Sequence, residues 1–175
     1  SNHTNRFLTG DVYPLSDENH VVMVQHGVTI LRGPRDEGYP FLSDAPAAIT
    51  VISVGTNKKT NRDTGVVYES GEEKIDLMMR IRLLLQAVAS SGCTAVVLSA
   101  LDCGIGGHAA EEVATLFKRE IYRVGSALLF VHFAVLNNAH QDPTVEGNFE
   151  QFLRILQRPA ELNPNWRSAK AVYNN

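Results

Sequence analysis

The sequence predicts an α/β protein with helices packed on a parallel sheet. Strands and helices alternate between Ile49 and Leu136 in a β-α-β-α-β series, and right-handed crossovers place such helices over the sheet. The clearest signal runs from Thr94 to Leu136, where an apolar run, a glycine-rich turn, an amphipathic helix and a second apolar run follow one another. At 175 residues, of which 44% are hydrophobic, the chain is long enough for one domain with a core.

The first half of the chain is predicted to contain three strand segments. Residues 21–24 and 28–32 are separated by His26-Gly27, which indicates a turn or a bulge. Residues 49–54 form a β-branched run that is consistent with a buried strand. We expect one domain over residues 1–160, followed by a polar, loosely attached tail over residues 161–175.

Three helices are predicted from apolar residues at helical spacing. The first begins at a capping box formed by Ser70 and Glu73 and extends to about Ser90. The third covers about residues 147–157. The apolar faces consist of Leu77, Met78, Ile81, Leu84, Leu85 and Val88 in the first helix, Ala110, Val113, Ala114, Phe117 and Ile121 in the second, and Phe149, Phe152, Leu153 and Leu156 in the third.

Composition argues against two classes of partner. The formal net charge of −3 gives no electrostatic basis for nucleic-acid binding, and no apolar run reaches the roughly 18 residues that span a bilayer.

Cys93 and Cys103 flank one predicted strand, which holds them roughly 30 Å apart, too far for a mutual disulfide. We therefore expect reduced thiols and a cytoplasmic location, with neither a metal nor a cofactor.

A glycine-rich turn, Gly104-Ile105-Gly106-Gly107, joins a predicted buried strand to the second helix. Free N–H groups and the helix dipole at such a helix start form a site for phosphate or another anion. Glycine permits close approach of a ligand, although tight turns also use glycine for geometry alone. A dinucleotide-binding fold is disfavoured, because no acidic residue stands where the next strand ends, at Leu136-Asn137-Asn138.

Three predicted strand ends converge on the same edge of the sheet. They are residues 54–57, 102–107 and 136–138. In parallel α/β sheets, ligands bind outside the carboxyl ends of the strands. The sequence therefore predicts a functional cleft at this edge.

Four segments, in order along the chain, resemble the microbial-type poly(ADP-ribose) glycohydrolases, a branch of the macrodomain superfamily. They read VQHGVTILRGPRDEGYPFL, ITVISVGTNKK, VVLSALDCGIGGHAAEEVATLFK and VHFAVLN…GNFEQFL, within a match from about Tyr13 to Leu156. The resemblance implies a macrodomain-like three-layer α/β/α sandwich that binds ADP-ribose and is incomplete at its N-terminal side in this chain.

The resemblance also implies a ligand site around the glycine-rich turn. Phe149 best matches an aromatic residue that stacks on adenine in many macrodomains, although it also lies on the apolar face of its helix. Asn57 and Asn137, at two of the strand ends, are further candidates for adenine or ribose contacts. The diphosphate and the distal ribose are expected to contact Gly104, Ile105, Gly106, Gly107 and His108.

The family's catalytic element does not occur in these residues. It is a glycine-rich loop with two adjacent glutamates, placed before the segment that matches Ser1 onward. Glu72-Glu73 and Glu111-Glu112 each lie in the first turn of a predicted helix, where the helix dipole accounts for them. Cleavage between ribose units needs a proton donor, whereas Asp102 suits an acceptor for turn amides and Cys103 has no assignable base nearby. We therefore assign no catalytic residue.

We expect an ADP-ribose-recognising macrodomain-like module whose hydrolase activity requires a segment absent from these residues. Two alternatives stay open: a non-catalytic interaction or assembly domain that has lost the ligand, and an enzyme that acts on another phosphorylated metabolite through the same anion loop. The expected partners are ADP-ribose or an ADP-ribosylated protein. An N-terminal segment or a second copy is expected to complete the sheet, because the family's early strands have no counterpart here.

Overall fold

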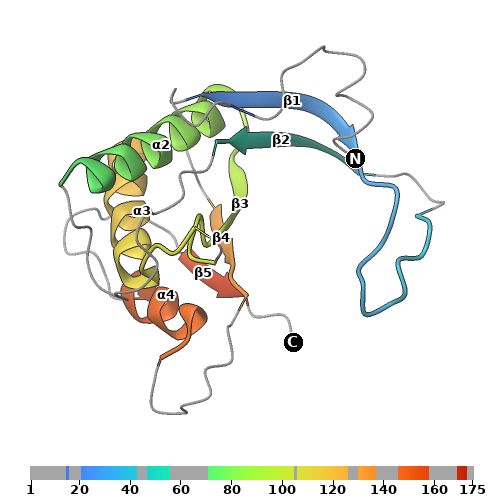
Figure 1. Ribbon diagram of the computed structural model, residues 1–175. Helices are drawn as coiled ribbons and strands as arrows, with labels where there is room; N and C mark the ends of the chain where they lie inside the picture. The colour runs from blue at the N-terminus through green and yellow to red at the C-terminus, as the bar shows by residue number, and fades with distance from the viewer. Residues whose placement is uncertain are drawn as a thin grey trace.

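The structure, a computed structural model, describes residue 15 and residues 21–42, 47–55, 71–104, 106–125, 130–136, 146–157 and 169–172. For residues 169–172 it describes the backbone alone. The elements in chain order (Figure 1) are β1 (Val22–Thr29), β2 (Ala48–Val54), α2 (Gly71–Ser90), β3 (Ala95–Ser99), α3 (Ala110–Val124), β4 (Phe130–Ala134), α4 (Asn148–Gln157) and β5 (Ala169–Val172).

The first two strands form an antiparallel pair that curves over one end of the molecule (Figure 1). The register between them shifts at Gln25 to Val28. Gly27 lies inside this shift with φ of +68°, a conformation that glycine adopts without steric cost. The predicted irregularity at His26-Gly27 is therefore a bulge, and it lies within one continuous strand.

The described parallel sheet has the order β3-β4-β5. Ala95 pairs with Phe130 and Val131 pairs with Ala169. The β3-α3-β4 segment is a strand, helix and parallel strand in succession, which confirms the mixed α/β class.

Two expectations about β2 are wrong. This strand pairs antiparallel with β1, and among the described residues no ladder joins it to β3. Its residues are exposed or half-buried, whereas a buried strand was expected. A short β-branched run indicates a strand but carries no information on its partner or direction, because these are set by tertiary packing.

The C-terminal segment contains a strand that the sequence analysis did not anticipate. Residues 169–172 form β5, which pairs with β4 along its whole length. This part of the expected loose tail is therefore attached to the sheet. The division at residues 160 and 161 remains a prediction.

α2 and α4 lie close to the bounds predicted for the first and third helices, and α3 contains the apolar residues predicted for the second. All of the apolar residues predicted for α3 are buried. In α2 the same is true except for Met78, which is half-buried, and in α4 Phe152 and Leu156 are buried while Phe149 and Leu153 are half-buried. Ser70 lies outside the described residues, so the capping box stays a prediction.

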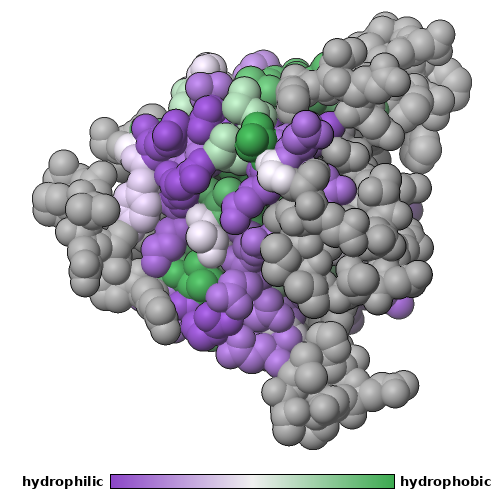
Figure 2. All heavy atoms as spheres, turned by 60° about the vertical axis from the view of Figure 1, so that its left-hand side comes forward, coloured by the Kyte–Doolittle hydropathy of each residue, from purple (hydrophilic) through white to green (hydrophobic). Residues whose placement is uncertain are grey.

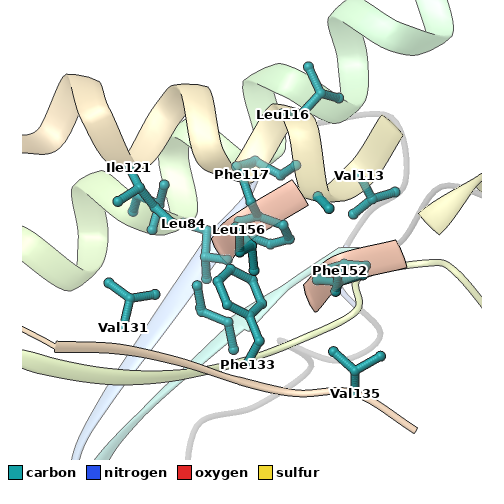
Figure 3. Close-up of a cluster of buried hydrophobic side chains, with 14 of the residues drawn as sticks. Leu84, Val113, Leu116, Phe117, Ile121, Val131, Phe133, Val135, Phe152 and Leu156 are labelled. Atoms are coloured by element: carbon teal, nitrogen blue, oxygen red, sulfur yellow. The ribbon is translucent and has the colours of Figure 1, made fainter. Parts of the chain in front are cut away.

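The core lies between the parallel sheet and the helices. The ring of Phe133 in β4 contacts that of Phe117 in α3 edge-to-face and that of Phe152 in α4 at a tilt, with centroids 5.1 Å and 5.5 Å apart (Figure 3). The described helices lie on one side of the sheet (Figure 1), and hydrophilic side chains dominate the coloured surface on that side (Figure 2). On the opposite side Val97 is 71% exposed and Leu136 is 78% exposed. The described residues therefore form two layers, and the third layer stays a prediction.

Candidate functional site

The loop between β3 and α3 is held in shape by its own backbone hydrogen bonds. The Cys103 amide donates to the Ala100 carbonyl at 3.2 Å, and the Gly107 amide donates to the Gly104 carbonyl at 3.1 Å. The His108 amide donates to the Asp102 carbonyl at 3.0 Å. The loop is thus a closed turn that precedes the first helical residue, Ala110.

Among the described residues of this loop, two have left-handed backbone conformations. Gly107 has φ of +76° and Asp102 has φ of +58°. Aspartate tolerates this region better than most residues because its short carboxylate can bond to the local backbone. The expectation that Asp102 structures the loop agrees with this conformation.

The glycines of the loop serve different needs. A Cβ on Gly106 would lie 2.7 Å from the carbonyl oxygen of Asp102, so the loop closes only because this side chain is missing. Gly104 is exposed, and a Cβ there would meet nothing within 4 Å. Packing therefore accounts for Gly106 and conformation accounts for Gly107, whereas neither accounts for Gly104.

The start of α3 has few intrahelical or side-chain partners for its amides. Its N-cap residue is Ala109, which has an extended backbone and makes no side-chain cap. The Glu111 amide donates to the Gln151 side chain of α4 at 3.0 Å. Within the described part of the chain, the amides of Gly104, Gly106 and Ala109 make no hydrogen bond. Donors of this kind beside a helix start attract anions.

The same contact brings α4 to this end of α3. Because Gln151 lies in the first turn of α4, the beginnings of the two helices are adjacent. Phe149 lies in that turn as well, half-buried and packed against the core. Its position is compatible with a ligand contact near the loop, but packing alone also accounts for it.

Neither Glu111 nor Glu112 is a free carboxylate. Glu111 pairs with Arg154 at 3.1 Å, and Arg154 also pairs with Glu146 at 3.0 Å. These carboxylates hold the pKa of Arg154 above its ordinary value through hydrogen bonds and charge. Glu112 accepts a hydrogen bond from Lys74 at 3.4 Å. The two glutamates therefore tie α3 to α4 and to α2.

Cys103 lies inside the loop as a protonated thiol. Its side chain is buried, and burial together with the nearby charge of Asp102 raises its pKa from 9.0 to about 12. A thiol of this kind is a poor nucleophile at neutral pH. Both cysteines are free, as expected.

Of the four remaining candidate residues, the structure describes one. His108 is 6% exposed and belongs to the structured loop. Ile105, Asn57 and Asn137 lie outside the described residues, so their roles stay predictions. The carboxyl ends of β3 and β4 lie side by side in the sheet.

The structure also shows how the end of β2 is held, which the sequence analysis missed. The buried Arg80 of α2 donates to the Gly55 carbonyl at 2.9 Å and pairs with Asp76 at 2.7 Å. The spacing of Asp76 and Arg80, four residues apart on one helix, was a usable signal for the ion pair.

Comparison with known proteins gives a structural likeness. No family model matches the chain, and no curated protein matches it. The poly(ADP-ribose) glycohydrolase from Deinococcus radiodurans in complex with ADP-ribose is 26% identical, with a TM-score of 0.59 over 77% of this chain and 52% of that one. The Thermomonospora curvata poly(ADP-ribose) glycohydrolase is 23% identical, with a TM-score of 0.59 over 77% of this chain and 46% of that one.

The chain therefore resembles bacterial poly(ADP-ribose) glycohydrolases in fold and spans about half the length of these structures. Within the described residues, no helix is long and apolar enough to cross a membrane.

Proposed function

We propose that this chain is an ADP-ribose-recognising, macrodomain-like module related to the poly(ADP-ribose) glycohydrolases. The observation that carries the proposal is the combination of a likeness to an ADP-ribose-bound structure with a glycine-rich loop in which the amides of Gly104, Gly106 and Ala109 make no hydrogen bond within the described residues, Gly104 and Ala109 being exposed. ADP-ribose carries a diphosphate, which is the kind of group that such amides bind. The proposal includes the complete three-layer sandwich.

The diphosphate and distal ribose are assigned to the loop, and the adenine to the side of α4. Phe149, Asn57 and Asn137 are the proposed adenine or ribose contacts. Gly104 is the sharpest element of the assignment, because it is exposed and no packing demand explains a glycine there. The proposed diphosphate and distal-ribose residues are Gly104, Ile105, Gly106, Gly107 and His108.

Hydrolysis by these residues alone is not part of the proposal. Cleavage of a bond between riboses requires a group that protonates the leaving oxygen. Glu111 and Glu112 are engaged in ion pairs, and the thiol of Cys103 stays protonated because its pKa is raised to about 12. Hydrolysis therefore depends on a segment outside these residues. The isolated chain is expected to bind ADP-ribose without cleaving a glycosidic bond.

Calorimetric titration with ADP-ribose, ADP and ribose 5-phosphate tests the proposal. Recognition of the intact ligand predicts the tightest binding for ADP-ribose, whereas a simple phosphate loop binds all three alike. Gly104→Val should weaken ADP-ribose binding by about tenfold or more, because a branched side chain would block close approach to the amides. Gly71→Val is the matched control, since a Cβ at either glycine meets nothing within 4 Å. Unchanged affinity in a folded Gly104→Val variant would refute the site.

A further inference from the structure

A cavity of about 540 Å³ lies between the C-terminal halves of α2 and α3, a volume within the range of small-molecule sites, roughly 300–1,000 Å³. Near their first turns the two helices are joined by Lys74 and Glu112. Arg82 and Glu120 join them further along, so the helices run parallel. Glu120 lies about 15 Å along α3 from its first residue, Ala110. The cavity is therefore separate from the glycine-rich loop, which precedes α3.

Positive charge exceeds negative charge around this cavity. The carboxylate of Glu120, which is 1% exposed, accepts two hydrogen bonds from Arg82, at 2.9 Å and 3.2 Å. Arg119 donates a third at 3.3 Å, and Arg123 pairs with the same carboxylate at 3.8 Å. Three guanidinium groups thus surround one carboxylate, which leaves an excess of two positive charges. Within the described residues, no other acidic side chain lines the cavity.

Arg123 is the guanidinium group most available to a ligand. Its side chain is 60% exposed, and its distance of 3.8 Å from Glu120 is too long for a hydrogen bond. A guanidinium group carries five N–H donors, and none of those on Arg123 donates to another described residue. Arg82 lines the same cavity and is held in place by its two hydrogen bonds to Glu120.

The ends of the helices do not reverse this charge. A helix C-terminus carries about half a negative charge, located on its unpaired carbonyl groups. At the end of α2, the Ser91 amide donates to the Ala87 carbonyl at 3.0 Å, and the Ser91 hydroxyl donates to the Val88 carbonyl at 2.6 Å. At the end of α3, the Gly125 amide donates to the Ile121 carbonyl. The excess of two positive charges therefore sets the sign of the local potential.

We propose that this cavity binds a phosphate group, free or carried by a small molecule, through Arg123 and Arg82. A phosphate monoester carries a charge of about −1.5 to −2 at pH 7, which matches the excess of guanidinium groups. Guanidinium groups bind phosphate oxygens with paired N–H donors. A carboxylate ligand would neutralise only one of the two excess charges. The inference does not depend on ADP-ribose binding at the loop.

Titration of the isotope-labelled chain with ribose 5-phosphate, followed by nuclear magnetic resonance, tests the inference. Amide signals of residues 86–90 and 119–124 should shift and saturate together, whereas ribose without phosphate should leave them in place. Inorganic phosphate is the second probe. Weaker binding of inorganic phosphate than of ribose 5-phosphate would assign the cavity to a phosphorylated small molecule, and equal binding would assign it to free phosphate.

Two substitutions change the charge of the cavity. Arg123→Gln should weaken binding of ribose 5-phosphate there by about tenfold or more, because a charged hydrogen-bond donor is lost. Gln86→Glu should weaken it as well, since it adds a negative charge to the lining while it keeps the side-chain size and the helix propensity. Arg35→Gln removes the same charge from an exposed turn and is the matched control. This variant should bind like the wild type.

Three results would overturn the inference. They are the absence of any shift in residues 86–90 and 119–124, equal affinity in the wild type and both cavity variants, and equal weakening by Arg35→Gln, which would show a response to net charge alone. Gly104→Val should leave this titration unchanged, although it is expected to weaken ADP-ribose binding at the loop. Failure of the cavity site is therefore distinguished from failure of the proposed function.

Discussion

At the scale of single residues, the loop from Ala100 to Ala109 shows what a glycine-rich motif does and does not reveal. The cluster at Gly104 to Gly107 predicts a tight turn before a helix, and the structure contains one. The sequence gives no means of separating glycines that the backbone needs from those left open for a ligand. That distinction depends on the Asp102 carbonyl, which lies within 2.7 Å of a Cβ on Gly106.

This distinction yields a stability prediction. Gly106→Ala should lower the free energy of unfolding by about 1–3 kcal/mol, because the added methyl group must displace backbone atoms of Asp102. Gly104→Ala should leave it within about 0.5 kcal/mol of wild type, since it adds a methyl group in open space. Urea denaturation followed by circular dichroism measures both. Equal midpoints for the two variants would contradict the loop geometry.

At the scale of elements, helical periodicity predicted which helix faces are buried, whereas the polar contacts between helices could not be predicted from the sequence. Leu77, Leu84 and Val88 are buried as predicted, because an apolar face is sufficient to orient a helix. Glu120 of α3, 1% exposed, joins α3 to α2 through Arg82 at 2.9 Å. A lone glutamate on a helix gives no sequence signal for such a contact, since its partner lies 38 positions away.

The Arg82 to Glu120 pair predicts a pH dependence. Burial raises the pKa of Glu120, but hydrogen bonds from Arg82 and Arg119 and nearby positive charge outweigh it, so the pKa lies below its ordinary value of 4.5. A carboxyl group whose pKa is lower in the folded state stabilises the fold above its unfolded pKa. That contribution is lost as the pH falls through the folded pKa.

Glu120→Gln should therefore lower the free energy of unfolding at pH 7 by about 1–3 kcal/mol and flatten its decline in acid. Glu37→Gln, which changes an exposed loop residue, is the control and should follow the wild-type profile. Chemical denaturation at a series of pH values from 7 downward measures both effects. An acid decline in Glu120→Gln as steep as in the wild type would rule out this carboxylate as its source.

At the scale of the whole molecule, the strand segments were predictable but their arrangement was not. The run at residues 49–54 identifies β2, yet its antiparallel partner β1 is chosen by tertiary packing. β5 is four residues long and reads AKAV, which is too short and too mixed for periodicity to indicate a strand. One edge strand of the parallel sheet is therefore formed by a segment whose local sequence does not predict a strand.

The attachment of β5 gives the last prediction. A chain that ends at Ser168 should be less stable than the full chain by about 2 kcal/mol or more, because it loses the ladder hydrogen bonds to β4. Amides of residues 131–134 should exchange faster in that variant, since one edge of β4 becomes exposed to water. A chain that ends at Val172 keeps β5 and is the matched control. If both truncated chains unfold at the wild-type midpoint, β5 contributes nothing to the sheet, and the C-terminal segment acts as the loose tail that its composition predicts.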